Sequence, residues 1–324
     1  MLTSDVVVIG GGQAGLAAAF YLRRAGIGHV VLDAQPVPGG AWPHTWNSLR
    51  LFSVARHSSL PGWPMPAFPD GYPTAQHVVD YLAAYEKRYD IPVHRPVQVT
   101  SVSRGEDGLL VHTDSGTWAA RHVISATGTW WRPFLPLTDL PGRRLHTVDY
   151  RDPLEFAGQN VVVVGGGNSG AQIAADLVPH ADLTWMTRRP PRYMPDEIDG
   201  KALFDIATRR GSVGELGDIV AVPPVREARD RGLLVAVPMD VDALGRADVV
   251  VWCTGFRSVL SHLAALRLRN AEGRVAVTGT TAVDEPRLHL LGYGSWTGPA
   301  SATLIGVGPT AKATVARIAA ALRP

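Results

Sequence analysis

The chain is almost free of cysteine: Cys253 is the single one among 324 residues. One thiol can form neither a disulfide framework nor a Cys-x-x-Cys redox pair within the chain. An excess of one charge is missing too, because 31 Lys and Arg face 29 Asp and Glu, for a formal net charge of +2. A balanced surface generates no basic field that would attract nucleic acid or a membrane. The expected partners are small molecules, and homodimer formation is left open.

Long apolar runs are also absent. The most apolar stretch, from Val6 to Leu22, is interrupted by four glycines and Gln13, and no basic residue precedes it. Signal peptides and membrane-spanning helices need an unbroken apolar segment. We therefore expect a cytoplasmic protein with no membrane span. The eleven histidines are scattered along the sequence and form no cluster with metal-ligand spacing, so no metal site is predicted.

What the chain does contain is one pattern that occurs twice. The runs Val6–Ile9 and Val161–Val164 each fit a buried parallel strand, followed by a glycine turn, an Ala-rich helical stretch and another apolar strand. The pattern predicts two βαβ units. Each turn carries the spacing G-x-G-x-x-G, at Gly10, Gly12 and Gly15 in the first unit and at Gly165, Gly167 and Gly170 in the second.

In this motif the first glycine makes a tight turn, and the second lets the backbone approach a pyrophosphate. The third lets the helix pack closely on the strand. Phosphates then bind at the helix N-terminus, where unpaired N–H groups and the helix dipole favour negative charge. Two matches in the same strand–turn–helix context favour two dinucleotide sites over ordinary structural turns.

The residues that end the second strand of each unit differ in charge. Asp33 follows Val30–Leu32, at a spacing suited to binding ribose hydroxyls, and this predicts FAD in the first unit. Arg188 and Arg189 follow the strand of the second unit. Guanidinium groups bind phosphate well, and these two would attract the 2′-phosphate of NADPH. The alternative for the two arginines is a solvated pair at a strand end.

Other segments carry weaker signals. Between the first unit and residue 76 the chain is rich in Pro, Gly and Trp, which predicts irregular structure that covers a site. Short strands are expected between the helix near residue 80 and Ala126. Helical spacing or helix-end residues predict four further helices, at Gln76–Tyr89, Asp199–Arg210, Pro223–Gly232 and Ser301–Leu322.

The segment that joins the two units, Leu140-Pro-Gly-Arg-Arg-Leu-His-Thr-Val-Asp-Tyr150, resembles the F-x-G-x-x-x-H-x-x-x-Y/F signature of flavin-containing monooxygenases, with Leu140 in place of Phe. Gly39–Trp42 is similar to a G-G-x-W stretch of the same family. Ala126–Gly128 and Cys253–Gly255 resemble its A-T-G motifs, with Cys253 in place of Ala. The resemblance covers nearly the whole chain.

Within the family, the short length and the tail from Gly292 to Pro299 look most like small bacterial members, including those associated with arsenic operons. Tyr150 is followed by Arg151, where Baeyer–Villiger enzymes typically have Trp-Pro, so conversion of ketones to esters is the less expected subclass. The Asn-Ser/Thr-Ser run of the animal enzymes is missing, since Leu51–Val54 stands in that region.

The resemblance implies that NADPH reduces FAD, that reduced flavin and O2 form a hydroperoxide at flavin carbon C4a, and that this species oxygenates a soft nitrogen or sulfur nucleophile. The protein positions the nicotinamide and excludes water. His146 and Tyr150 are the candidate catalytic residues, with a structural role at the domain junction as the alternative. The residues expected to bind the cofactors are Gly10, Gly12, Gln13, Ala14, Gly15, Asp33, Ala34, Gly40, Trp42, Ala126, Thr127, Gly128, Gly165, Gly167, Asn168, Ser169, Gly170, Arg188, Arg189, Thr254, Gly255, Gly292 and Tyr293.

Two other functions fit the two motifs. An NADPH-dependent flavoprotein reductase would pass electrons to ferredoxin or flavodoxin, and it needs neither a second cysteine nor the 140–150 signature. A non-catalytic nucleotide sensor would bind without turnover.

The expected fold is α/β, with two Rossmann-like dinucleotide-binding domains. An FAD domain would comprise residues 1–157 and 258–324, and an NADPH domain at 158–257 would be inserted into it.

Overall fold

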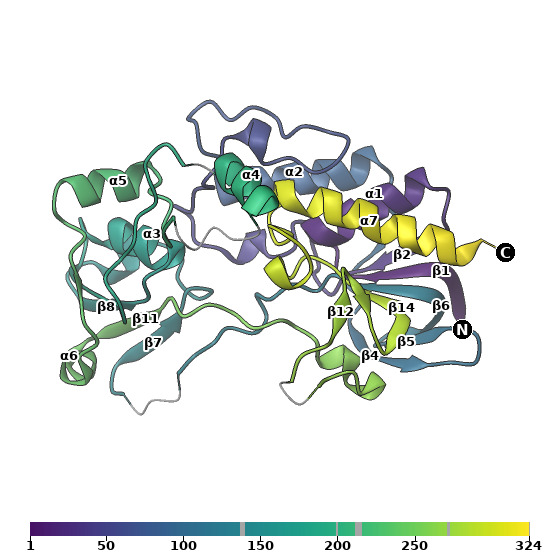
Figure 1. The fold of residues 1–324 in the computed structure, drawn as a ribbon. Coiled ribbons are helices and arrows are strands. Elements are labelled where there is room, and N and C mark those ends of the chain that lie inside the picture. Colours follow the sequence, from purple (N-terminus) through teal and green to yellow (C-terminus); the bar gives the residue numbers. More distant parts are fainter. Residues whose placement is uncertain (137–139, 199, 211–215, 271–272, 324) are drawn as a thin grey trace.

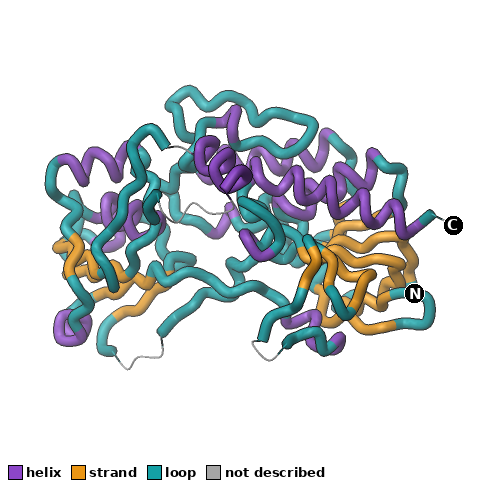
Figure 2. The backbone as a smooth tube through the Cα atoms, in the orientation of Figure 1, coloured by secondary structure: helices purple, strands orange, loops and turns teal. Residues whose placement is uncertain are grey.

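The computed structural model describes residues 1–136, 140–198, 200–210, 216–270 and 273–323. The strands within these residues form two sheets, one of nine strands and one of five. The two sheets lie at opposite ends of the molecule, and extended loop segments connect them (Figure 1, Figure 2). Each sheet carries one of the glycine motifs, so the predicted pair of βαβ units is present.

The larger sheet has the strand order β12-β13-β14-β6-β1-β2-β3, and β4 and β5 extend it from β6. Its centre is parallel, since β1 pairs with both β2 and β6 in the same direction. The bounds of its strands are β1 Leu2–Ile9, β2 His29–Leu32, β3 Val93–His94, β4 Val99–Arg104, β5 Leu109–Thr113, β6 Gly116–Ser125, β12 Val277–Thr278, β13 Thr281–Ala282 and β14 Glu285–Leu290.

The end of β1 is buried on both faces, as its unbroken apolar run predicts. Val6 and Val8 pack toward the helices on one side, whereas Val7 and Ile9 pack toward β4, β5 and a 3₁₀ turn on the other. Alternate side chains of a strand point to opposite faces, so an apolar run without alternation fits a strand covered twice. The helices on the first face are α1 Gln13–Arg24, α2 Ala75–Arg88 and α7 Leu304–Leu322 (Figure 1).

The predicted helices are present, with shifts of up to three residues at their ends. The helix α7 begins at Leu304 and not at Ser301, because the Thr303 hydroxyl accepts a hydrogen bond from the Gly306 N–H at 3.0 Å and caps it. The other helices are α3 Asn168–Leu177, α4 Gly200–Arg210, α5 Pro223–Asp230 and α6 Val241–Arg246. Short 3₁₀ turns lie at Trp42–His44, Ala55–His57, Pro153–Phe156, Ser261–Leu266 and Gly294–Trp296.

The smaller sheet has the order β10-β9-β8-β11-β7 and is parallel throughout. Its strands are β7 Arg143–His146, β8 Asn160–Val164, β9 Asp182–Met186, β10 Ala236–Val237 and β11 Val249–Trp252. The predicted domain boundary near residue 158 stays a prediction, and β7, which precedes it, pairs with β11 in the smaller sheet. Among the described residues no helix is both long and apolar enough to cross a membrane.

Two buried histidines make stability depend on pH. Burial lowers the pKa of His262 to about 4 and that of His289 to about 3, where His122 and Arg317 add to the effect. In the unfolded chain these histidines bind protons below about pH 6.5. In the folded protein they bind protons only when the pH falls to their lowered pKa values, so acid favours the unfolded state. The free energy of unfolding should therefore fall as pH decreases from about 6.5 toward 4, by up to about 1.4 kcal/mol per pH unit for each ring.

Urea unfolding at several pH values checks this. His289→Gln, which cannot titrate, should show a smaller slope of unfolding free energy against pH than the natural protein. His94→Gln, at an exposed position, is the matched control. Identical slopes for the His289 variant and the natural protein would contradict the prediction.

Candidate functional site

The first and third glycines of the N-terminal motif are required by the protein's own backbone. Gly10 has φ +106°, and a Cβ there would stand 2.6 Å from the Ala126 carbonyl oxygen. A Cβ at Gly15 would stand 1.9 Å from the Gly10 carbonyl oxygen. Any side chain at Gly15 would push α1 away from β1. These contacts fix the helix N-terminus directly behind the turn.

The middle glycine is different. Gly12 has φ −82°, which any residue adopts, and a Cβ there would meet only the Gly40 Cα atom, at an ordinary 3.5 Å. Nothing in the protein requires glycine at this position. A ligand that approaches the backbone does require it, and the N–H groups at the start of α1 would bind its phosphate. Gly12 therefore fits a dinucleotide cradle.

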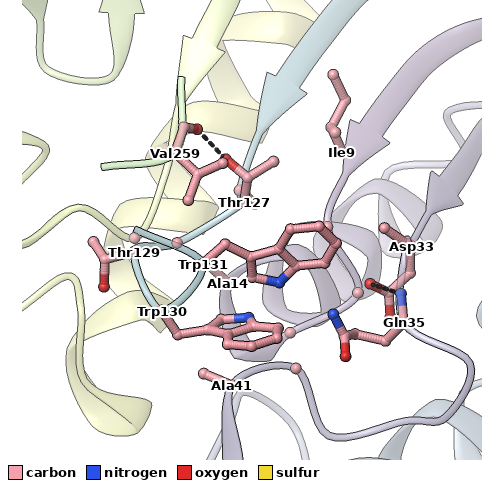
Figure 3. A pocket seen from close by; sticks show the side chains of 18 of the residues that line it. Ile9, Ala14, Asp33, Gln35, Ala41, Thr127, Thr129, Trp130, Trp131 and Val259 are labelled. Atoms are coloured by element: carbon pink, nitrogen blue, oxygen red, sulfur yellow. Dashed lines mark hydrogen bonds between the residues drawn. The ribbon is translucent and has the colours of Figure 1, made fainter. Parts of the chain in front are cut away.

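A cavity of about 440 Å³ opens in front of this turn (Figure 3). The structure gathers most of the predicted FAD residues around it, although they come from four separate parts of the chain. Gly15 packs against the end of β1 and does not line the cavity. The predicted residues that do line it are Gly10, Gly12, Gln13, Ala14, Asp33, Ala34, Gly40, Trp42, Ala126, Thr127, Gly128, Gly292 and Tyr293.

Asp33 lines the cavity at the end of β2, and neighbouring residues hold its carboxylate. Oδ1 accepts a hydrogen bond from the Gln35 N–H at 3.3 Å, and Oδ2 lies 2.9 Å from Arg95 Nε. Arg95 in turn makes two bonds to Glu86, at 2.7 and 3.0 Å. Burial would lower the pKa of the Arg95 guanidinium, but its pairing with Glu86 and Asp33 raises it overall. Sequence reasoning missed Arg95 because it lies in no motif.

Trp42 joins three segments at the cavity. Its Nε1–H donates to Gln13 Oε1 at 3.1 Å, and Gln13 Nε2 donates to the Ala302 carbonyl at 2.7 Å. The segment after β2, the start of α1 and the approach to α7 are thereby tied together. Gln13 and Trp42, both predicted to bind the cofactor, are thus in direct contact.

Tyr293 belongs to a set of hydrogen-bonded hydroxyls in the cavity wall. Its hydroxyl lies 2.8 Å from Thr127 Oγ1 and 3.0 Å from Ser125 Oγ, and Ser125 contacts His262 Nε2 at 3.0 Å. Thr127 donates to the Val259 carbonyl at 2.6 Å (Figure 3). Burial raises the pKa of Tyr293, so it stays a neutral phenol. These bonds join the ends of β6 and β14 to the segment after β11.

Two tryptophans on the cavity wall were not predicted. Trp130 and Trp131 project from the loop after β6 toward Asp33 and Gln35 (Figure 3). The Trp130 ring stacks on His44, with centroids 3.6 Å apart. His44 Nε2 in turn bonds Gln35 Oε1 at 2.8 Å. The sequence signal was available, because only Thr129 separates the two tryptophans from the Ala126–Gly128 motif.

The second glycine motif repeats the geometry of the first. Gly165 has φ +145°, and a Cβ there would lie 2.4 Å from the Cys253 carbonyl oxygen. A Cβ at Gly170 would lie 2.1 Å from the Gly165 carbonyl oxygen. At Gly167, with φ −110°, a Cβ would meet nothing within 4 Å. Again, no contact within the protein requires glycine at the middle position, and its missing side chain leaves the start of α3 open to a ligand.

The residues around this second turn are partly engaged. Asn168, the first residue of α3, accepts the Val220 N–H at 2.8 Å through its side-chain oxygen, and Ser169 follows it. Arg188 and Arg189 are exposed directly after β9. Within the described residues neither of the two makes a hydrogen bond or an ion pair. They are therefore available to an anionic ligand near the motif.

His146 and Tyr150 lie away from the cavity. The His146 side chain is fully buried, its Nε2–H donates to the Gly255 carbonyl at 2.9 Å, and its Nδ1 accepts the Val148 N–H at 3.3 Å. Burial lowers its pKa, so the ring is neutral. The Tyr150 hydroxyl donates to Asp176 at 2.8 Å, and burial raises its pKa. These contacts favour the structural alternative over proton transfer.

The junction between the two sheets is built around these residues. Thr254 donates to the Phe134 carbonyl, and the Gly255 carbonyl accepts from His146. The predicted Thr254–Gly255 pair therefore contacts the segments that join the two sheets and does not line the cavity. Ser48 donates to the same Asp176 oxygen as Tyr150, at 2.8 Å. A carboxylate on α3 thus connects the smaller sheet to the segment that precedes α2.

Residues 7–285 match the model of one protein family, the pyridine nucleotide-disulphide oxidoreductases. The chain belongs to this family. A flavin-containing monooxygenase from Stenotrophomonas maltophilia is 47% identical, with both chains covered completely and a TM-score of 0.92. A CzcO-like oxidoreductase from Geobacillus kaustophilus is 30% identical over 95% of this chain and 96% of its own. These findings confirm the predicted fold class, the resemblance to flavin-containing monooxygenases and the assignment as an oxidoreductase.

A disulfide reductase is among the solved structures that share the fold, whereas this chain has a single cysteine. A bacillithiol disulfide reductase from Staphylococcus aureus shares the fold at 18% identity and a TM-score of 0.74. The thiol of Cys253 stands alone, and burial raises its pKa to about 12. A dithiol cannot form from one cysteine. No set of three or more metal-binding side chains occurs in the described part of the chain.

The open space at Gly167 generates a prediction. Gly167→Ala should change the free energy of unfolding by roughly 1 kcal/mol or less, since its Cβ meets no atom. The KM for the nicotinamide dinucleotide should rise about tenfold or more, because a methyl group there keeps the pyrophosphate from the backbone. Steady-state kinetics and thermal unfolding measure the two effects. Gly170→Ala is the contrasting variant and should lose more than about 2 kcal/mol of stability. Unchanged nucleotide affinity in Gly167→Ala would contradict the assignment.

Proposed function

We propose that the protein is an NADPH- and O2-dependent flavin monooxygenase that oxygenates a small, soft nitrogen or sulfur nucleophile. One observation carries this proposal: two dinucleotide cradles occur on two sheets of one chain, and the segment between them resembles the flavin-containing monooxygenase signature. The full-length similarity to a flavin-containing monooxygenase supports it.

FAD in the first cavity would supply the electron transfer and the oxygen chemistry that the side chains lack. The chain's own residues bind and orient it. The start of α1 would bind the pyrophosphate, Asp33 would accept hydrogen bonds from a ribose, and the bonds of Gln13 and Trp42 hold the cavity wall. At the second turn, the start of α3 would bind the pyrophosphate of NADPH, and Arg188 and Arg189 would bind its 2′-phosphate.

An oxygen-labelling screen tests the proposal. The purified protein, saturated with FAD, is mixed with NADPH, ¹⁸O2 and a panel of amines, sulfides, indoles and trivalent arsenicals. The expected result is a product that contains one ¹⁸O atom, while the second oxygen atom leaves as water. Oxidation of NADPH without any labelled product, together with rapid electron transfer to ferredoxin or flavodoxin, would instead show a reductase.

The two exposed arginines predict selectivity for NADPH over NADH. A hydrogen bond to a charged group contributes about 1.5–3 kcal/mol, and each 1.4 kcal/mol is about tenfold in affinity. We expect kcat/KM for NADPH to exceed that for NADH by roughly ten- to a hundredfold. Replacing Arg188 and Arg189 together by Ala should remove this preference and leave NADH use nearly unchanged.

Arg231→Ala is the matched control. Arg231 is an exposed arginine that follows α5 directly and pairs with Glu227. It should keep the NADPH preference. If the natural protein uses both nucleotides equally well, or if the double variant still prefers NADPH, the two arginines do not bind the 2′-phosphate.

A further inference from the structure

Arg95 lies outside both glycine motifs, yet it contacts a residue of the cavity wall through an ion pair that is nearly closed to solvent. We propose that Arg95 is a positioning residue that orients the Asp33 carboxylate toward the ribose of the adenosine half of FAD, and so makes the protein select FAD over FMN. This inference rests on the proposed binding of FAD in the first cavity.

The geometry fixes the carboxylate from both sides. Arg95 Nε lies 2.9 Å from Asp33 Oδ2, and the Gln35 N–H donates to Oδ1 at 3.3 Å. The backbone adds two bonds, since the Asp33 N–H donates to the His94 carbonyl at 3.0 Å and the Val97 N–H donates to the Asp33 carbonyl at 2.8 Å. Two bonds thus hold the carboxylate and two hold the backbone of Asp33, which lines the cavity; each carboxylate oxygen can still accept a further hydrogen bond.

Glu86 holds the arginine in the same way. Both of its carboxylate oxygens accept from Arg95, at 2.7 and 3.0 Å, in the two-point geometry that a guanidinium favours. The side chains of Arg95 and Asp33 are only 10% and 7% exposed, so little water can replace either partner. A buried carboxylate without its partner would be costly, and it would also repel the phosphates of an incoming dinucleotide.

A separate observation links the pair to the glycine motif. Gly11 occupies a variable position of G-x-G-x-x-G, where the motif itself requires no glycine. A Cβ at Gly11 would stand 2.6 Å from Asp33 Oδ2 and 2.8 Å from Arg95 Nη2. The chain therefore has glycine at residue 11 to leave room for the Asp33–Arg95 pair directly beside the phosphate-binding turn. Gly11→Ala should displace the pair and mimic the loss of Arg95.

Comparing FAD with FMN tests the proposal, because FMN lacks the adenosine half and cannot use Asp33. Apoprotein prepared from the full chain is titrated with each flavin, and fluorescence quenching gives the dissociation constant. Arg95→Ala should weaken FAD binding by about ten- to a hundredfold and leave FMN binding within about twofold of the natural protein. Arg95→Lys, which keeps the charge but loses the two-point contact, should recover part of the FAD affinity.

Arg104→Ala is the matched control. Arg104 lies on β4 of the same sheet and pairs with the buried Glu285 at 2.8 Å, but it does not line the cavity. It should leave both affinities unchanged. Equal losses of FAD and FMN affinity in Arg95→Ala would show a merely structural residue and overturn the proposal, as would an unchanged FAD affinity. If the natural protein itself shows no preference for FAD over FMN, the proposed FAD site is wrong as well. This outcome differs from a failure of the Arg95 proposal alone, in which the natural protein still prefers FAD.

Discussion

The site depends on a close contact between two stretches of backbone at each glycine turn. At both turns the third glycine places its Cα where a Cβ would meet a carbonyl oxygen, at 1.9 Å for Gly15 and 2.1 Å for Gly170. Only this contact lets each helix start immediately behind its strand. The free N–H groups of α1 and α3 then face outward, where a pyrophosphate can accept their hydrogen bonds. The middle glycines, Gly12 and Gly167, keep that space empty, and so the same local geometry produces two binding sites.

The selectivity of each site comes from groups placed around the turn by more distant parts of the chain. At the larger sheet, Arg95 bonds the Asp33 carboxylate, and Glu86 on α2 bonds Arg95. The orientation of the Asp33 carboxylate therefore depends on α2 and on the residue after β3, both of which follow the glycine motif in the sequence. In the smaller sheet, Arg188 and Arg189 are exposed shortly after the end of β9. A compensated carboxylate thus lies at the first turn, whereas exposed cations lie near the second.

At the junction between the sheets, the signature residues bond to the protein's own groups. His146 uses both ring nitrogens on backbone groups, and Tyr150 uses its hydroxyl on Asp176. Because Ser48 donates to the same carboxylate, α3 is attached to the segment that borders the first cavity. The signature residues thus help to set the position of the smaller sheet relative to the first cavity.

The sequence by itself determined the elements that local physics controls. Four-residue apolar runs, glycine spacing and helix-end residues predicted β1, β8, α1, α3 and the helices α2, α4, α5 and α7, because strand burial, positive φ and capping are properties of neighbouring residues. Tertiary structure alone decided which residues complete the site. Arg95, Glu86 and His262 carry no local signal for their roles, since an arginine in a chain with 31 basic residues is indistinguishable from a surface charge until the sheet brings it to Asp33. The same holds for His146 and Tyr150, whose motif gives their positions but not their partners, because those partners, Gly255 and Asp176, lie 109 and 26 residues away along the chain.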